Sequence, residues 1–272
     1  SEQLVEALNS QPGAERSARM AAIAAQERLL GNGTAALELA AVSAQEAERS
    51  GSRSMYAEAL LTLAQAHRSK GNNEQAIAMA NKAALIALSV SDPLHTQALL
   101  DMADHYQALG FPQRSLELLA ELTDAGTLTD AERTRATILK ASALSQDHNA
   151  QQAIALLTAE RNATAMEERE ARSALDAELA RLLAGTGQYA EACAFEQEAM
   201  TLAIALGRPL EAATAANNWG VLLHRIKRMD QALQVLARAE MLAEGDADRT
   251  ARIRMNKALA LADAGQAEAG LR

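Results

Sequence analysis

Apolar and polar residues alternate along the chain with the period of an α-helix, and short polar turns interrupt the pattern. Residues 57–76 read AEALLTLAQAHRSKGNNEQA, in which an apolar helical pattern, a turn with glycine and a second helix start follow one another. The same order occurs in residues 96–115, 173–192 and 213–232. The pattern therefore predicts a chain of helical hairpins.

Small residues occupy two fixed positions in these hairpins. The first position holds Ala24, Ala64, Ala103, Ala141, Ala180, Gly220 and Ala258. The second, twelve residues later, holds Ala36, Ala76, Ser115, Ala153, Ala192, Ala232 and Gly270. Subtracting neighbours in the first column gives spacings of 40, 39, 38, 39, 40 and 38. Antiparallel helices joined by a short turn cross closely only where the contact residues are small, so the columns mark those crossings. They predict units that start near residues 17, 57, 96, 134, 173, 213 and 251.

This pattern resembles the tetratricopeptide repeat. The first helix of that repeat carries a large–x–x–large–small pattern, seen here as Leu60-Leu63-Ala64, and its turn resembles Gly187-Gln188-Tyr189. The units are longer than usual and are similar to those of kinesin light chains and of bacterial regulator sensor segments. The resemblance implies an all-α, right-handed α-solenoid of stacked antiparallel helix hairpins over residues 17–272, with six complete repeats and a partial seventh. Residues 1–16 are expected to form an N-terminal helical cap or leader.

The last hairpin stops at Leu271-Arg272, just inside its expected second helix. A solenoid normally ends in a cap with a polar outer face. We therefore expect a longer parent polypeptide, and the alternative is an intact protein with a frayed last hairpin.

Composition supports helices and narrows the classes of function. Aromatic residues make up 2% of the chain although 49% is hydrophobic, so alanine does much of the packing, and only 4 prolines interrupt the helices. A net charge of −9 argues against a nucleic-acid partner. No uninterrupted apolar run approaches the length of a membrane-spanning helix, so we expect no membrane partner. The single cysteine, Cys193, allows no intrachain disulfide and fits a cytoplasmic location.

The motifs of known chemistry are weak or missing, so we expect no enzyme activity, no cofactor and no metal. GNGTAA (31–36) and GTGQYA (185–190) match a loose dinucleotide fingerprint, but they follow helical segments and fall at repeat turns, where glycine serves as a helix C-cap. Asp104-His105 is not a ready site because adjacent helix residues do not share a face. We interpret Cys193 as a buried structural thiol.

The resemblance implies that first helices line a concave groove, with the fifth, ninth and twelfth residues of each unit facing it. The candidate ligand contacts on or beside these positions are Gln65, Arg68, Asp104, Gln107, Arg181, Asn217, Asn218, His224 and Asn256. An asparagine amide donates and accepts, so Asn217 suits the backbone of an extended peptide, whereas Asn218 could instead bond to an adjacent repeat. Trp219 falls among packing positions and is expected to be buried, and the basic residues from His224 to Arg228 are expected to form a solvated helix end.

These features predict a protein- or peptide-binding module, the sensor or regulatory segment of a larger bacterial signalling or transcription-regulating protein. The groove positions are acidic in the third unit and basic or polar in the fifth and sixth, which would suit a peptide with separated basic and acidic ends. The alternative is a structural scaffold or self-association module with no specific groove ligand.

Overall fold

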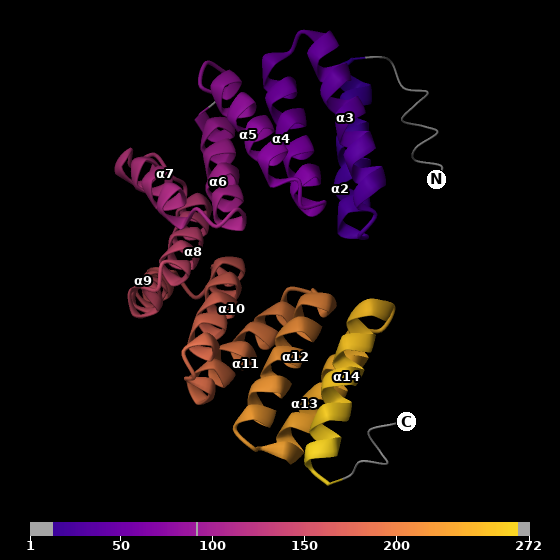
Figure 1. The fold of residues 1–272 in the computed structure, drawn as a ribbon, viewed down its shortest axis with the longest axis vertical. Coiled ribbons are helices and arrows are strands. Elements are labelled where there is room, and N and C mark those ends of the chain that lie inside the picture. The colour runs from indigo at the N-terminus through magenta and orange to yellow at the C-terminus, as the bar shows by residue number, and fades with distance from the viewer. Residues whose placement is uncertain (1–12, 91, 266–272) are drawn as a thin grey trace. The chain divides into compact units, whose positions relative to one another are not determined.

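The computed structural model describes residues 13–90 and 92–265, and within these ranges it contains thirteen α-helices and no β-strand (Figure 1). The helices are α2 (Ala14–Leu29), α3 (Gly33–Ser50), α4 (Arg53–Ser69), α5 (Asn73–Ala87), α6 (Asp92–Ala108), α7 (Pro112–Asp124), α8 (Asp130–Gln146), α9 (Ala150–Ala163), α10 (Arg169–Gly185), α11 (Tyr189–Ala205), α12 (Pro209–Arg225), α13 (Met229–Leu242) and α14 (Ala247–Asp263). The fold is all-α, as the pattern predicts. Among the described helices, none has the length and apolar character that a membrane crossing requires.

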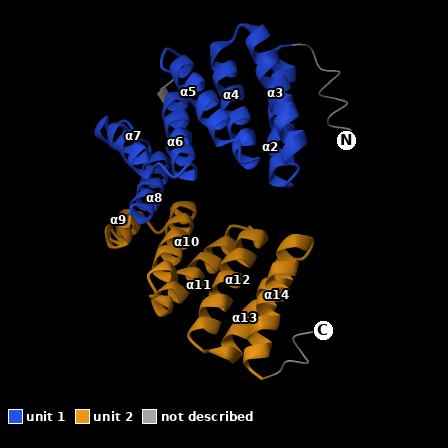
Figure 2. Cartoon of the chain, viewed as in Figure 1, with its two compact units in different colours: residues 1–147 blue, residues 148–272 orange. Residues whose placement is uncertain are grey.

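The chain divides into two compact units, residues 1–147 and residues 148–272 (Figure 2). In the first unit, α2 to α8 are antiparallel and each helix packs against the next. In the second unit, α9 to α14 are arranged in the same way. Each unit is therefore a stack of helix hairpins, which is the architecture of an α-solenoid.

The first helix of each hairpin lies on the inner side of its stack. Beyond the contacts between sequence neighbours, α2 contacts α4, α4 contacts α6, and α6 contacts α8. In the second unit α12 contacts α14. Helices that touch their second neighbours lie on the inside of a curved stack, so each unit has one face lined by first helices. We call this surface the inner face of the unit.

Burial confirms that the two columns of small residues are packing positions. The first column is at most 1% exposed at Ala24, Ala64, Ala103, Ala141 and Ala180. The second is fully buried at Ala36, Ala76, Ser115, Ala153, Ala192 and Ala232. Ala258 is only half-buried, and Gly270 lies outside the described residues. Small side chains at these positions let the paired helices approach closely.

The turn between the two helices of a hairpin needs one residue in the left-handed conformation. Glycine supplies it in most hairpins, but Lys227 adopts a φ of 62° and His148 a φ of 63°. GNGTAA and GTGQYA both lie at such turns, with helices on either side. Gly31 and Gly187 supply the left-handed residue after α2 and α10, as expected, whereas Gly33 begins α3. Both motifs follow a helix and not a strand.

The first helices begin three or four residues before the unit starts predicted from the columns. α2 begins at Ala14 instead of 17, and α4 at Arg53 instead of 57. Side-chain caps that the column argument ignores lie at three of these starts: the Ser52 hydroxyl accepts from the Met55 amide, Thr129 forms a capping box with Glu132, and Asp246 accepts from the Arg249 amide. The helices α2, α10 and α12 begin without a side-chain cap. The expected leader over 1–16 overlaps α2 at residues 14–16, and its first twelve residues lie outside the described ranges. The end of the last hairpin, residues 266–272, also lies outside them.

Candidate functional site

The inner face of the first unit contains a cavity of about 490 Å³. Its lining comes from α2, α4, α6 and α8, the four first helices of that unit: Arg28, Gln65, Arg68, Ser69, Asp101, Asp104, His105 and Arg135. Three predicted ligand contacts, Gln65, Arg68 and Asp104, therefore meet in one place. We call it the arginine cavity.

Hydrogen bonds and ion pairs connect the helices around the arginine cavity. Arg68 Nη2 donates to Asp104 Oδ1 at 2.8 Å, and Gln65 Nε2 donates to Asp101 Oδ2 at 3.3 Å. Arg135 forms an ion pair with the buried Asp101. Arg28 has no ion-pair partner among the residues that the structure describes. The third unit contributes the two aspartates, and the three arginines come from the first, second and fourth units, so the lining as a whole carries an excess positive charge.

His105 lies behind this network. It is 1% exposed, and both ring nitrogens are buried without a hydrogen-bond partner in the described part of the chain. Burial lowers the pKa of the imidazole to about 4, so the ring is neutral near pH 7. Burial also raises the pKa of the Asp104 carboxyl, and the Arg68 guanidinium opposes that shift. Asp104 and His105 are both among the residues that line the cavity, with the His105 ring buried behind the carboxylate network.

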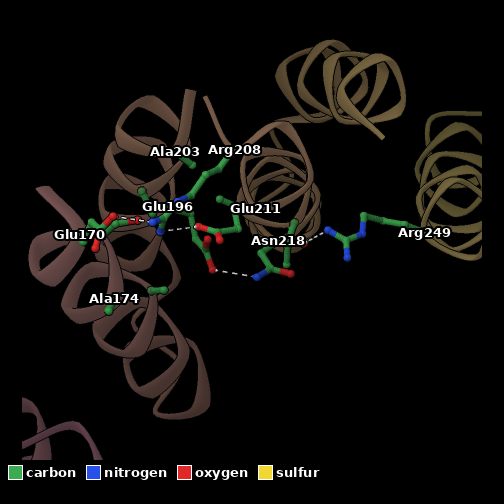
Figure 3. Close-up of a pocket in the computed structure, with 13 residues that line it drawn as sticks. Glu170, Ala174, Glu196, Ala203, Arg208, Glu211, Asn218 and Arg249 are labelled. Atoms are coloured by element: carbon green, nitrogen blue, oxygen red, sulfur yellow. Dashed lines mark hydrogen bonds and ion pairs between the residues drawn. The ribbon is translucent and has the colours of Figure 1, made fainter. Parts of the chain in front are cut away.

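The second unit has a different cavity, of about 370 Å³, between α10, α11, α12 and α14 (Figure 3). Its lining is Glu170, Ser173, Ala174, Ala177, Glu196, Ala199, Ala203, Arg208, Glu211, Thr214, Ala215, Asn218 and Arg249. Of the predicted contacts, only Asn218 lies here. We call it the glutamate cavity.

Glu196 is the buried acid of this cavity. Its side chain is 4% exposed, and Asn218 Nδ2 donates to its Oε1 at 3.1 Å (Figure 3). Burial raises the pKa of the carboxyl to about 7, and the bond from Asn218 partly offsets that rise. The other two glutamates of the lining, Glu170 and Glu211, each pair with Arg208. Glu196 therefore has no cationic partner in the described structure.

The remaining predicted residues bond to neighbours in the same unit. Asn256 Nδ2 donates to Asn217 Oδ1 at 2.9 Å, which joins α14 to α12. Arg181 donates twice to Glu178, one turn earlier on its own helix, at 2.8 and 2.5 Å. His224 Nε2 lies 2.8 Å from Asp263 Oδ2.

Two sequence expectations about burial are wrong, one in each unit. Gln107 does not face a groove: it is 7% exposed and donates to the Ser115 hydroxyl at 2.8 Å and to the Leu139 carbonyl at 3.0 Å. Trp219 is half-buried instead of buried, and it packs against two core clusters of the second unit. Cys193, in contrast, is buried as expected, and its burial raises the pKa of the thiol.

Sequence reasoning missed Arg28, Arg135 and Glu196. Arg28 is the twelfth residue of its unit, the position that Arg68 holds in the next unit, so the register itself offers it as a candidate. Arg135 is the second residue of its unit, and Glu196 belongs to a second helix, so neither stands at a groove position of the register. Comparing the units along their second helices would have singled out Glu196. No group of three His, Cys, Asp or Glu side chains that could hold a metal ion occurs in the described ranges.

No protein-family model and no curated protein matches the sequence. Solved structures with stacked helix hairpins do match. A signal transduction ATPase with numerous domains, carrying a tetratricopeptide repeat sensor, from Pyrococcus horikoshii superposes with a TM-score of 0.68 over 87% of this chain and 37% of that chain, at 14% identity. The chain has the tetratricopeptide-repeat fold.

Two further structures share the tetratricopeptide-repeat fold. A Rap protein complexed with competence and sporulation factor covers 95% of both chains, with a TM-score of 0.59 and 12% identity. A kinesin light chain protein with nearly identical TPR-like repeats from Podosopora anserina covers 71% of this chain and 97% of that chain, with a TM-score of 0.54 and 22% identity. Similarity at this level of identity establishes the fold and leaves the ligand to be argued from the cavities.

Proposed function

We propose that the chain is a non-enzymatic tetratricopeptide-repeat module that binds a peptide or protein segment on its inner face. The arginine cavity carries this proposal, because charged side chains from four successive first helices meet around one opening. The Rap protein with the same fold is complexed with competence and sporulation factor, which supports a ligand-binding role for such an array.

The chemistry of the arginine cavity favours a ligand with a carboxylate. Arg68 and Arg135 are held by Asp104 and Asp101, so their side chains are ordered before a ligand arrives. Arg28 is the cation whose charge no described residue balances. An acidic side chain or the C-terminus of a peptide would pair with it, and a guanidinium recognises a carboxylate through two parallel hydrogen bonds.

We further propose that the module is the sensor or regulatory segment of a larger bacterial signalling or transcription-regulating protein. The support is the match to a signal transduction ATPase whose tetratricopeptide repeats are described as its sensor, in which the matched part is 37% of the chain. That the two units form one continuous solenoid in the parent protein is part of this proposal.

Selection of peptides from a random display library on the whole chain tests the binding proposal. Peptides selected by the wild type are expected to lose about tenfold in affinity for Arg28→Ala, because a charge-assisted hydrogen bond is lost. Arg28 is the residue to change because its removal strands no ion-pair partner among the described residues.

The matched control is Arg114→Ala on α7, a second helix, where the side chain is 71% exposed and pairs with Glu117. Selected peptides should bind this variant like the wild type. Equal affinity for Arg28→Ala, or a selection that yields no peptide, would contradict the proposal. Reversible self-association in sedimentation velocity, together with such a failure, would favour the scaffold alternative.

A further inference from the structure

Glu196 stands at a position that is apolar in the other described units. Four residues after the second column of small residues lie Ala40, Ala80, Leu119, Leu157, Glu196 and Leu236. The five apolar residues are fully buried, and Glu196 is also buried, at 4% exposure. A glutamate is almost never this buried without a partner, since desolvating a charge costs far more than desolvating a leucine. Packing alone does not account for this residue.

The surroundings of Glu196 do not neutralise it. Its Oε1 accepts from Asn218, while its Oε2 and the Asn218 Oδ1 accept no hydrogen bond in the described part of the chain. Neither oxygen is among the fully enclosed side-chain atoms that lack a partner. Two acceptors therefore remain for a donor that enters the glutamate cavity.

The walls of the glutamate cavity suit an aliphatic chain. Five alanines line it: Ala174, Ala177, Ala199, Ala203 and Ala215. Its volume of about 370 Å³ falls in the range of ligand pockets and exceeds that of several water molecules. Alanine walls around a buried carboxylate favour a group with an apolar stem and a cationic end.

We propose that the glutamate cavity binds the side chain of a lysine from a peptide or protein ligand, with the ammonium group held by Glu196 and Asn218. This inference rests on the proposed function and names one side chain that the ligand would present to the second unit. The methylene stem packs against the alanine walls, and the ammonium donates to Glu196 Oε2 and Asn218 Oδ1.

The charges around the cavity agree with a cationic guest. The charged groups that line it are Glu170, Glu196, Glu211, Arg208 and Arg249, so the lining carries one net negative charge when Glu196 is ionised. Arg208 is paired with Glu170 and Glu211, and Arg249 with Asp246. Because burial raises the pKa of Glu196 to about 7, a bound ammonium would favour the ionised carboxylate.

Lysine fits better than arginine because of how the acceptors are arranged. A guanidinium binds a carboxylate best through both oxygens at once, and Asn218 already occupies Oε1 of Glu196. An ammonium is a compact point charge that can donate to separate acceptors such as one carboxylate oxygen and one amide oxygen.

The test uses the whole chain and Nα-acetyl-lysine N-methylamide as the probe, followed by the side-chain amide resonance of Asn218 in ¹⁵N NMR. A saturable shift is expected with this probe and not with the matching norleucine compound, which lacks the ammonium. Binding should strengthen as pH rises through about 7, where Glu196 ionises. No shift, or an equal shift with norleucine, overturns the proposal. Tighter binding of the free diamine cadaverine would overturn the assignment to a ligand's side chain.

Three variants separate recognition from folding. Glu196→Gln keeps the shape and should weaken the lysine probe about ten- to hundredfold, as expected for the loss of charge-assisted hydrogen bonds. Glu178→Gln on α10 is the control, because Glu178 pairs with Arg181 and does not line the cavity. Glu196→Leu restores the residue type of the other units and should remove binding while raising the unfolding temperature. A fall in that temperature would assign Glu196 a structural role and overturn the proposal.

The peptide selection separates this inference from the proposed function. Enrichment of lysine on the wild type, lost on Glu196→Gln, supports both. Selected peptides without lysine, whose binding is unaffected by Glu196→Gln, support the proposed function and overturn the lysine site. A selection that yields no peptide, with the lysine probe still bound at Glu196, contradicts the proposed function and leaves the lysine site supported.

Discussion

Replacing Gly220 by alanine should destabilise the second unit, although alanine is the better helix former. Gly220 is the one non-alanine residue in the first column of small residues. A Cβ added there would lie 2.5 Å from Leu236 Cγ and 2.7 Å from Leu236 Cδ2. Leu236 is fully buried on α13, so its side chain cannot swing out to solvent. The space that alanine needs is already occupied.

The expected change in the free energy of unfolding for Gly220→Ala follows from two opposing effects. Glycine to alanine in a helix gains about 0.8–1 kcal/mol of intrinsic propensity. Carbon atoms pack at about 3.5–4.0 Å, so the new methyl would overlap Leu236 by about 1 Å or more. Overpacking of this kind costs about 1–3 kcal/mol. We therefore expect Gly220→Ala to lower the free energy of unfolding by about 1 kcal/mol.

The coupling free energy between positions 220 and 236 tests the clash more directly than the single variant does. Leu236→Ala alone should cost about 2–5 kcal/mol, because it leaves a cavity in a tight interface. In the double variant the methyl introduced at position 220 no longer clashes and fills part of that cavity, so the costs should fall short of additivity by about 1–3 kcal/mol. Urea unfolding followed by the fluorescence of Trp219, the neighbour of Gly220 and the only tryptophan, reports on this unit.

Gly185→Ala is the matched control. Gly185 is also helical, at the end of α10, but nothing lies within 4 Å of its added Cβ. This variant should be neutral or stabilising by up to about 1 kcal/mol. If Gly220→Ala is stabilising to the same extent, or if its effect adds to that of Leu236→Ala, then close approach does not explain the glycine and the reasoning is refuted.

Three further predictions concern stability. Lys227→Gly should raise the free energy of unfolding by about 1 kcal/mol in urea titrations, because Lys227 has a left-handed φ of 62° and its 3.8 Å contact with Asp263 is exposed and weak. The control Lys70→Gly, at a residue without positive φ, should not raise it. Burial raises the pKa of Glu196 to about 7, so the folded state favours the protonated carboxyl, and the stability that this contributes below the unfolded pKa near 4.5 is lost as pH rises through 7. Glu196→Gln should remove this dependence of stability on pH. Above pH 8 the variant should be up to about 3 kcal/mol more stable than the wild type in thermal or urea unfolding. Asp176→Asn should cost about 1–3 kcal/mol, because it removes a fully buried charge-assisted hydrogen bond to Arg161, which still pairs with Glu198. A cost below that of the exposed variant Asp130→Asn would contradict this account.

The hairpin architecture could be predicted from sequence because its cause is local and repeated. A close crossing of two helices demands small residues at one spacing, and the same demand recurs in every unit, as Ala64 and Ala76 illustrate. The first residue of each helix was harder to predict from sequence, because capping side chains such as Ser52 and Thr129 lie outside the columns. The repeat period fixes how far apart the helices recur, and side-chain caps mark the starts of α4, α8 and α14.

The cavities could be predicted only in part. Gln65, Arg68 and Asp104 follow from the unit register, but Gln107 stands at the same unit position as Arg68 and is buried. A long polar side chain takes the nearest partners available, and for Gln107 these are Ser115 and the Leu139 carbonyl, which belong to the next two helices. Which neighbour is within reach depends on the packing of several helices together, and that is not a property of one position.

Because the units share one register, a pair like Glu196 and Asn218 can be built at the corresponding positions of another unit. Leu236 stands one unit after Glu196, and Asn256 stands one unit after Asn218, since both asparagines are five residues beyond the predicted start of their units. By this register a Leu236→Glu exchange would bring a glutamate to the unit position that corresponds to Glu196, with Asn256, whose amide now donates to Asn217, at the position that corresponds to Asn218. An array of this kind can gain or move a specificity determinant by one substitution, so its repertoire of ligands can evolve hairpin by hairpin while the helices themselves stay unchanged.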